Sequence, residues 1–251
     1  MNDIHTHILP KVDDGASNLK ITFNMLYEAI NTGINEIAAT PHYYAGSYEI
    51  NYKKIQSKVK ALNELISNRK LNIKVYPGQE VFFTMNIINE YKHGNIGTIN
   101  ESRYMLIEFD FDYFYDGIMR KLYELQILGV VPVIAHPERY SYIINTPTFI
   151  NKFIDEGYLF QLNSGSLEGK FGRDIKRTAK ILLNNNIYSF IGSDAHNTNT
   201  RSLKMEKALR IIQRKNSMYL NMLEDNSQKI FDDKEIVFIG QKIKKIKWLN
   251  F

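Results

Sequence analysis

Two histidines two residues apart open the chain, in the segment Asp3-Ile4-His5-Thr6-His7. Side chains at positions i and i+2 of an extended segment point to the same face, so His5 and His7 can bind one metal ion together. Pro10 and the turn Asp13-Asp14-Gly15 then end this segment and bring a carboxylate beside the two imidazoles. The start of the sequence therefore predicts a metal site.

A pair of histidines with this spacing is common in proteins that bind no metal, so the other four histidines decide how it is interpreted. Three of them sit beside a proline or close to an aspartate directly after an apolar run, namely His42, His136 and His196. The fourth, His93, follows no apolar run and is expected to be solvated at the end of a helix. Five histidines therefore share one kind of position, the end of a predicted strand.

Four carboxylates occupy comparable positions after apolar runs or in the first turn. Each residue taken alone also has an ordinary role, such as a helix-start carboxylate, a turn former or a hydrogen-bonded loop histidine. Such ordinary roles at one end of one fold would require nine coincidences. The candidate metal ligands are His5, His7, Asp14, His42, Glu80, Glu108, His136, Asp194 and His196.

This set of imidazoles and carboxylates contains no sulfur and exceeds what one tetrahedral ion binds. It suits a cluster of two or three divalent ions such as manganese, iron or zinc, with Glu80 or another carboxylate as a bridge. Clustered ions activate a bridging water and neutralise both the attacking and the leaving oxygens, which is the arrangement used on phosphate esters. The ligand set therefore favours phosphate-ester hydrolysis.

Apolar runs alternate with segments of helical periodicity, which indicates βαβ units and a parallel α/β sheet. Because the polar candidates follow strands, a barrel whose strand ends converge at one mouth positions them better than a doubly wound open sheet. Seven strands are predicted, at the N-terminus and at residues 34–40, 72–76, 104–107, 130–135, 158–162 and 187–192. Helices are predicted at residues 18–32, 48–68, 117–128, 148–156, 174–184 and 202–214.

The composition limits the remaining possibilities. A chain of 251 residues with 44% hydrophobic and 24% charged residues is expected to form one α/β domain. The absence of cysteine excludes a disulfide framework, a thiolate metal site and a cysteine nucleophile. No signal peptide or membrane span is recognisable, so a cytoplasmic protein is expected. The net charge of +5 favours an anionic partner, such as a phosphorylated chain, nucleic acid or an acidic membrane face.

The sequence motifs around the candidate ligands resemble those of the manganese-dependent bacterial protein tyrosine phosphatases of the polymerase-and-histidinol-phosphatase (PHP) superfamily. They are the segments that contain His5 and His7, Asp14, His42, Glu80, His136 and Asp194. The resemblance runs from Met1 to roughly Leu209. It implies a distorted seven-stranded, TIM-like (β/α) barrel, and one PHP-type phosphatase domain over residues 1–251. It also implies a role in capsular or exopolysaccharide synthesis, through dephosphorylation of a membrane-associated tyrosine autokinase. Manganese is the implied metal, with iron, zinc or cobalt as alternatives.

The resemblance also assigns roles to individual residues. One ion would be held by His5, His7, Glu80 and Asp194, a second by Glu80, Glu108 and His136, and a third by Asp14, His42 and His196. Arg139 and Arg201 would hold the phosphate, although Arg201 lies at a predicted helix start, where an arginine is more often solvated. The chain departs from the family at Lys11, where glycine is expected, and this difference bears on loop geometry.

Two other functions remain open at this point. The same chemistry could act on a small metabolite such as histidinol phosphate, whose ammonium would require an acidic side chain beside the metals. A metal-dependent nuclease should show a longer basic groove with interleaved aromatics, and a scaffold would have little use for so many ligands. No nucleic-acid partner is therefore expected.

Two aromatic loops and one basic segment complete the predictions. A few exposed rings near the metal mouth are expected to stack on an aryl substrate, while most pack over the barrel. The basic residues 242–249, in a tail from about residue 241 to residue 251, could touch an anionic membrane or an acidic kinase tail, or could form a solvated face. The rings are Tyr43, Tyr44, Tyr48, Phe109, Phe111, Tyr113, Phe114 and Tyr115.

Overall fold

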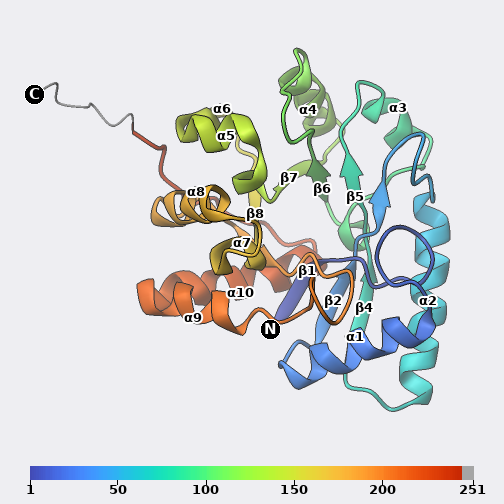
Figure 1. The fold of residues 1–251 in the computed structure, drawn as a ribbon. Coiled ribbons are helices and arrows are strands. Elements are labelled where there is room, and N and C mark those ends of the chain that lie inside the picture. The colour runs from blue at the N-terminus through green and yellow to red at the C-terminus, as the bar shows by residue number, and fades with distance from the viewer. Residues whose placement is uncertain (245–251) are drawn as a thin grey trace, which may run out of the picture.

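Two curled parallel sheets form the centre of the computed structural model, which describes residues 1–244 (Figure 1). One sheet has the strand order β1-β2-β4 and the other the order β3-β5-β6-β7-β8-β9, and every neighbouring pair is parallel. The strands are β1 (Asn2–Thr6), β2 (Glu36–Ala39), β3 (His42–Tyr43), β4 (Lys74–Pro77), β5 (Glu80–Phe82), β6 (Tyr104–Glu108), β7 (Val131–Ala135), β8 (Leu159–Asn163) and β9 (Phe190–Gly192).

Two pairs of strands that follow each other closely in the sequence lie in different sheets, because a two-residue interruption separates the members of each pair. Only Thr40 and Pro41 separate β2 from β3, and only Gly78 and Gln79 separate β4 from β5. Proline has no backbone N–H to donate to a neighbouring strand, which accounts for the break at Pro41. The structure therefore divides the predicted strand at residues 34–40 from its continuation at His42, a break that the sequence pattern did not predict.

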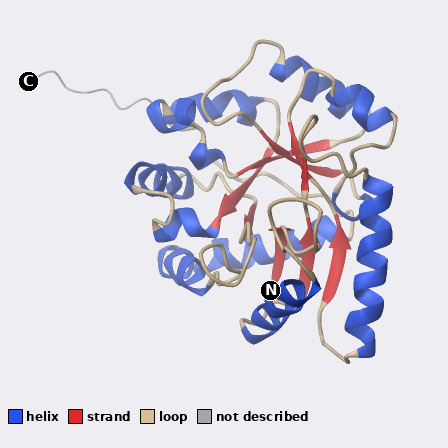
Figure 2. Cartoon of the chain, turned by 45° about the vertical axis from the view of Figure 1, so that its right-hand side comes forward, coloured by secondary structure: helices blue, strands red, loops and turns tan. Residues whose placement is uncertain are grey.

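The first strand also meets the end of the last one. Thr6 forms a parallel bridge with Ala195, and the amide of His7 donates to the carbonyl oxygen of Ala195 at 2.8 Å. This contact brings the N-terminal histidines beside the segment after β9. Figure 2 shows the strands grouped centrally, with helices around them.

The helices surround the sheets and bury their apolar stripes against them. In α2, for example, the buried residues Ile55, Val59, Leu62 and Ile66 recur at helical spacing. The side chains of Asn18 and Asn51 cap α1 and α2 by accepting from backbone amides in the first turn. The helices are α1 (Leu19–Asn31), α2 (Tyr52–Asn68), α3 (Ile87–Lys92), α4 (Ile118–Ile127), α5 (Ser141–Asn145), α6 (Asn151–Asp155), α7 (Ser164–Glu168), α8 (Arg173–Asn184), α9 (Glu206–Lys215) and α10 (Ser217–Phe231).

Three of these helices, α5, α7 and α10, were not predicted from the sequence, whereas α3 ends at the exposed His93, as expected for that residue. The helix α10 buries the polar residues Asn226 and Ser227 as well as apolar ones, and Asn226 donates to the Ser189 carbonyl at 3.0 Å. Buried polar side chains of this kind conceal the apolar periodicity by which a helix is recognised. The predicted helix at residues 148–156 begins as a 3-10 turn, Pro147–Ile150, before α6.

The C-terminal segment is attached to the body as far as residue 243. The Gln241 amide donates to the Asn185 carbonyl at 2.8 Å, the Ile243 amide donates to the Asn151 side chain at 2.9 Å, and Lys242 pairs with Asp155. The predicted basic tail therefore begins later than residue 241, and residues 245–251 of it lie outside the described part. Within residues 1–244, no helix is both long enough and apolar enough to cross a bilayer.

Candidate functional site

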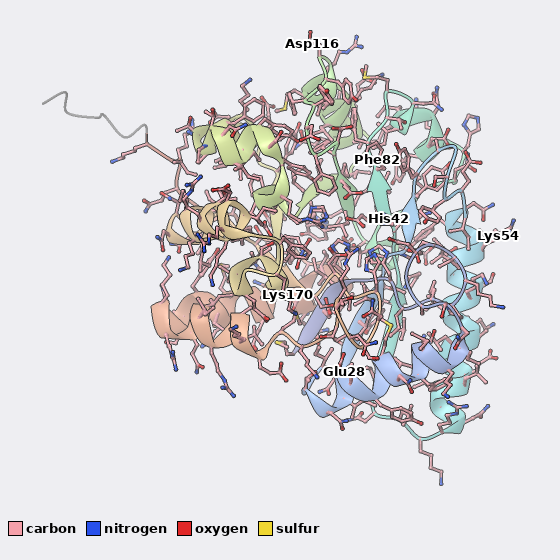
Figure 3. The ribbon with its side chains drawn as sticks, in the orientation of Figure 1. Glu28, His42, Lys54, Phe82, Asp116 and Lys170 are labelled. Carbon is pink, nitrogen blue, oxygen red and sulfur yellow. The ribbon has the colours of Figure 1, made fainter. Side chains whose placement is uncertain are left out.

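All nine candidate ligands lie at the C-terminal ends of strands or in the segments that follow them. His5 lies in β1 and His7 directly after it, while His42 opens β3 and Glu80 opens β5. Glu108 ends β6, and the remaining candidates follow β1, β7 or β9. In Figure 3 the labelled His42 lies near the middle of this face. Parallel strands that curl together bring these ends into one region, as the sequence pattern predicted.

A first group joins β1 to β5 and the loop after β9. The Nε2 atom of His5 lies 3.2 Å from Glu80 Oε2, and His7 Nε2 lies 3.3 Å from the same oxygen. Asp194 Oδ1 lies 3.6 Å from His5 Nε2 and 3.4 Å from His7 Nε2. All four side chains are buried, and their ligand atoms lie within 4.8 Å of one another. This group equals the first set implied by the resemblance.

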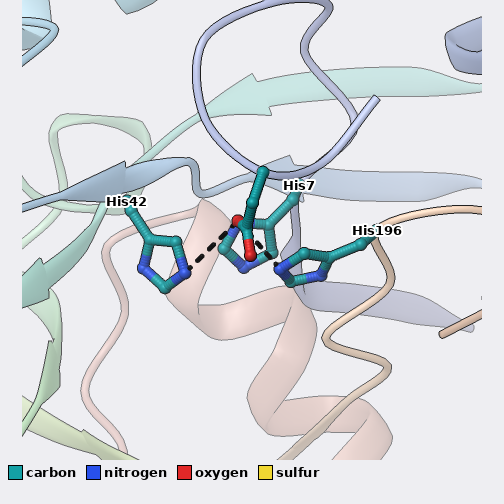
Figure 4. Close-up of side chains that lie close together, drawn as sticks. His7, His42 and His196 are labelled. Carbon is teal, nitrogen blue, oxygen red and sulfur yellow. Dashed lines mark ion pairs between the residues drawn. The ribbon is translucent and has the colours of Figure 1, made fainter. Parts of the chain in front are cut away.

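A second group gathers around the carboxylate of Asp14 (Figure 4). Asp14 Oδ1 lies 3.2 Å from His196 Nε2 and 3.6 Å from His42 Nε2. The rings of His7 and His196 lie close together, with their centroids 3.8 Å apart. His7 therefore joins the three residues that the resemblance had placed together, and it belongs to both the first and the second group.

A third group contains His42, Glu80 and Glu108. The Nδ1 atom of His42 lies 3.1 Å from Glu80 Oε2 and 3.8 Å from Glu108 Oε2. His136, which the resemblance had placed here, contacts the same two carboxylates through its Nε2 atom, at 2.9 Å from Glu80 and 3.6 Å from Glu108. Glu80 thus contacts members of all three groups, as expected for a bridging carboxylate.

Two of the candidate ligands, His136 and Glu80, are held in protonation states that bind cations. Burial, together with the positive charge of Arg139, lowers the pKa of His136 to about 4, so its imidazole is neutral near pH 7. Burial would raise the pKa of Glu80, but His5 and His42 outweigh it and hold the pKa well below its usual range. Glu80 Oε2 and His196 Nε2 are buried without a hydrogen-bond partner. Buried nitrogen and oxygen atoms that lack a hydrogen bond, yet lie close to one another, fit a metal ion, because neutral imidazoles and ionised carboxylates are its ligand forms.

Three polar residues that the sequence analysis did not select hold the candidate ligands in place. Asp13 Oδ2 accepts from His7 Nδ1 at 2.7 Å, Gln161 Oε1 lies 3.0 Å from His5 Nδ1, and Asn163 donates to Asp194 at 2.7 Å. Asp13 directly precedes the selected Asp14, so the sequence did mark its turn. Asn163 ends β8 and could have been found by that position, whereas Gln161 lies two residues earlier in β8 and carries no such signal.

The turn after β1 depends on two unusual backbone positions. Lys11, where glycine was expected, has a positive φ of 57°, a conformation that glycine adopts without strain. At Gly15, a Cβ atom added to the backbone would lie 2.1 Å from the carbonyl oxygen of His7. Lys11 therefore adopts the left-handed backbone conformation for which glycine is usual, while residue 15 must be glycine because there is no room for a Cβ atom.

Both candidate arginines reach the cluster through Asp194. Arg139 Nη1 lies 3.2 Å from Asp194 Oδ2, and Arg201 Nη2 lies 2.6 Å from Asp194 Oδ1. The guanidinium of Arg139 also lies over the rings of Phe111 and Phe171, at 4.7 and 4.8 Å from their centroids. Arg201 is thus paired inside the site rather than solvated at a helix start.

A cavity of about 410 Å³ opens over the cluster and has both polar and aromatic walls. Tyr44 and Phe82 stack with their centroids 4.2 Å apart on one wall, and Phe82, labelled in Figure 3, was not among the predicted rings. Among the predicted rings, Phe109 is fully buried, whereas Tyr113 is 66% exposed outside the cavity. The lining residues are Asp14, His42, Tyr44, Tyr48, Glu80, Phe82, Glu108, Asp110, Phe111, Asp112, His136, Arg139 and Arg201.

Comparison with known proteins agrees with this geometry. Residues 1–232 match the family model described as "Capsular polysaccharide synthesis, CpsB/CapC". The chain is 33% identical over 237 residues to the tyrosine-protein phosphatase YwqE of Bacillus subtilis, covering 94% of this chain and 93% of YwqE. It is 37% identical over 210 residues to the putative tyrosine-protein phosphatase CapC of Staphylococcus aureus, covering 82% of this chain and 81% of CapC.

Solved structures extend the comparison to three dimensions. A crystal structure from work on YwqE of Bacillus subtilis and CpsB of Streptococcus pneumoniae, described as unique metal-dependent tyrosine phosphatases, superimposes with a TM-score of 0.92. It is 33% identical and covers 98% of this chain and all of its own. A β-aspartyl dipeptidase from Fervidobacterium islandicum, 12% identical with a TM-score of 0.52 over 92% of this chain and 72% of its own, shares the fold alone. The chain belongs to the CpsB/CapC family of capsular polysaccharide synthesis proteins.

Proposed function

We propose that the chain is a metal-dependent phosphatase that hydrolyses phosphotyrosine in proteins. The observation that carries the proposal is the convergence of three groups of metal-binding side chains and two arginines beneath one cavity. The names of YwqE, CapC and CpsB as tyrosine-protein phosphatases support it. The substrate in the cell would be a membrane-associated tyrosine kinase that controls capsular or exopolysaccharide synthesis, and the enzyme would act in the cytoplasm.

The proposed metal is manganese, with two or three ions held by the nine candidate ligands. Bound divalent ions would supply an activated water and neutralise charge on the phosphate oxygens. The donor set of nitrogen and oxygen atoms without sulfur supports a metal such as manganese, iron, zinc or cobalt. Relative to the sets implied by the resemblance, the contacts above add His7 to the group around Asp14 and His42 to the group around Glu108.

The two arginines would bind the phosphate. Each guanidinium offers a planar fork of N–H donors that matches two phosphate oxygens, and in this structure that fork is turned toward Asp194. The rings of Phe111 and Phe171 hold the guanidinium of Arg139 from the side, which limits the conformations that it must lose on binding. Arg139 is therefore held both by its ion pair with Asp194 and by the two rings.

The aromatic wall of the cavity favours an aryl substrate. Tyr44, Phe82 and Phe111 line the cavity together with the metal-binding side chains, so a ring attached to the phosphate would meet ring faces. A phenolate leaving group has a pKa of about 10, far below that of an alkoxide, so it can depart without a dedicated general acid. Both features support phosphotyrosine over phosphoserine.

A small-molecule phosphatase remains the second candidate, because Asp110 and Asp112 also line the cavity. These carboxylates could meet an ammonium group such as that of histidinol phosphate, a possibility that the sequence analysis did not recognise. However, Asp110 Oδ1 already accepts from the amides of Asp112 and Tyr113, both at 2.9 Å. That turn occupies one oxygen of Asp110, which favours a structural role.

A side-by-side assay with manganese present separates the two candidates. We expect kcat/KM for phosphotyrosine peptides to exceed that for histidinol phosphate and for phosphoserine peptides by at least about a hundredfold, on the order of 3 kcal/mol. Asp112→Asn should leave this preference unchanged, whereas a preference for histidinol phosphate that Asp112→Asn abolishes would assign the protein to the second candidate.

We further propose that residues 1–251 form one domain around a distorted seven-stranded barrel. Joining β2 to β3 and β4 to β5 across their two-residue interruptions reduces the nine described strands to seven. The bridge between Thr6 and Ala195 supports closure between the first strand and the last. A peripheral membrane contact through the basic tail also remains a proposal, and residues 245–251 that would make it lie outside the described part.

A further inference from the structure

The outward faces of α8 and α9 are strongly basic, and the proposed phosphatase chemistry does not use them. On α8, Arg173, Arg177 and Lys180 form an exposed stripe at helical spacing. On α9, the corresponding exposed stripe consists of Lys207 and Arg210, followed by Arg214. The two stripes define what is here called the basic flank.

The two helices lie side by side. The ammonium of Lys215, at the end of α9, donates to the Leu183 carbonyl near the end of α8 at 2.7 Å, and α7 packs against both helices. Figure 1 shows α8 and α9 on the same flank of the molecule, and Figure 3 shows nitrogen-tipped side chains projecting there. A helix of twelve residues such as α8 is about 18 Å long, so the flank is broad.

Few acidic groups belong to this flank itself, while α10, which packs against α9, carries the exposed Glu224 and Asp225, the latter paired with Lys229. Among the described residues, the ion pairs close to it are Arg177 with Asp174 at 3.0 Å and Lys170 with Glu168 at 3.5 Å. The acidic side chains in residues 168–215 outside the metal centre are Glu168, Asp174 and Glu206. The cationic ones outside the centre are Lys170, Arg173, Lys176, Arg177, Lys180, Lys204, Lys207, Arg210, Arg214 and Lys215.

The chain leaves the body beside the same flank. Gln241 is hydrogen-bonded to Asn185, the residue that caps the C-terminal end of α8. The sequence then continues with Lys244, Lys245 and Lys247 interleaved with apolar residues and Trp248. Lysine alternating with apolar and indole side chains is the composition of segments that settle at a membrane interface. The tail sequence and the basic flank therefore indicate the same kind of partner.

We propose that the basic flank of α8 and α9 is a docking surface for an anionic lipid bilayer. Each Lys or Arg near such a surface adds to the attraction, and the attraction needs a broad cationic face rather than a shaped pocket. Within the two described stripes there is no aromatic side chain on which the bases of a single-stranded nucleic acid could stack. Docking there would hold the catalytic mouth close to a substrate anchored in the same membrane.

Vesicle co-sedimentation of the full-length protein tests this proposal. The variant Arg173→Gln/Lys180→Gln/Lys207→Gln/Arg210→Gln removes four charges from the basic flank. The matched control Lys53→Gln/Lys54→Gln/Lys58→Gln/Lys60→Gln removes four charges from exposed positions of α2, which Figure 1 shows on the opposite side. Both variants should keep wild-type circular dichroism and wild-type turnover of a small aryl phosphate, because neither set touches the metal centre.

The wild type is expected to bind vesicles of phosphatidylcholine with phosphatidylglycerol, but not vesicles of phosphatidylcholine alone. Binding should disappear at about 1 M salt, where the Debye length is about 3 Å. The flank variant should partition at least about tenfold less than the wild type, and the α2 control should lose no more than about twofold, since only the flank variant loses cations from the docking face.

Three results would overturn the proposal. The first is equal loss of binding in the flank variant and the α2 control, which would make the attraction a property of net charge. The second is complete loss of binding when only residues 245–251 are deleted, which would show that α8 and α9 do not bind the membrane by themselves. The third is a wild-type protein that binds polyglutamate but not anionic vesicles, which would assign the flank to an acidic protein.

Discussion

Asp13 Oδ2 lies 2.7 Å from His7 Nδ1 and also accepts from the backbone amide of His42 at 3.0 Å. One buried carboxylate oxygen therefore positions two candidate metal ligands, one directly after β1 and one in β3. Burial would lower the pKa of His7, but the charge of Asp13 and its hydrogen bond outweigh burial and raise it. Because Asp13 accepts the proton on Nδ1, Nε2 is the atom of His7 that faces the metal site.

Replacing Asp13 by Asn should weaken metal binding without removing a proposed ligand. The amide oxygen is a poorer acceptor for His7 Nδ1, so the manganese affinity is expected to fall about ten- to a hundredfold. Calorimetric titration of metal-free protein measures this change. The control Asp174→Asn alters an exposed ion pair far from the site. Unchanged affinity in Asp13→Asn would show that the contact is only structural.

Removing the metal should abolish turnover while the fold persists. Chelation is expected to stop hydrolysis of a small aryl phosphate, and added Mn²⁺ should restore it, whereas thiol alkylation should have no effect because the chain has no cysteine. Elemental analysis of active protein provides the independent measurement, and active protein free of transition metal would contradict the assignment. Replacing Glu80 or His136 by Ala should lower kcat by several orders of magnitude, because each replacement removes a proposed metal ligand.

Replacing each arginine by Ala should weaken phosphate binding with the metals retained. A charge-assisted hydrogen bond contributes about 1.5–3 kcal/mol, so kcat/KM is expected to fall roughly ten- to a hundredfold. Measured metal content separates this effect from loss of an ion, since both arginines also pair with Asp194. Wild-type kinetics in Arg201→Ala would leave Arg139 as the phosphate ligand.

Adding one methyl group at Gly15 should disturb the turn that carries Asp13 and Asp14. A Cβ there would lie 2.1 Å from the backbone oxygen of His7, so the turn must move away. Overpacking of this kind costs about 1–3 kcal/mol, which should lower both the Tm and the metal affinity of Gly15→Ala. Ser17→Ala, an exposed change in the same loop, should alter neither quantity.

Glu90 predicts a specific dependence of stability on pH. The hydrogen bond from the Tyr43 hydroxyl, at 2.7 Å, is the main cause of a lowered Glu90 pKa. Because the folded protein favours the ionised carboxylate, this contribution is fully present above the ordinary value of 4.5 and is lost as the pH falls through the lower folded-state pKa. Glu90→Gln should therefore lower the Tm at pH 7 and converge with the wild type toward pH 3. In a Tyr43→Phe background the difference at pH 7 should be smaller.

The sequence alone determined the chemistry and the fold class. Strand-ending positions of His5, His42, Glu80 and Asp194 were recognisable because apolar runs mark strands, and because parallel strands end at one edge. The absence of sulfur restricted the donors to nitrogen and oxygen. These conclusions depend only on local patterns along the chain, which is why they did not need the tertiary structure.

Only the tertiary structure decided how the ligands are divided and which residues support them. His7 contacts two groups of ligands, and His42 approaches Glu108, because the strands curl and bring side chains far apart in sequence within a few ångströms. Gln161 and Phe82 show no distinguishing pattern in the sequence, since a glutamine or phenylalanine in a strand is common. Their roles follow from atoms contributed by other strands, and the order of residues along one chain does not contain those distances.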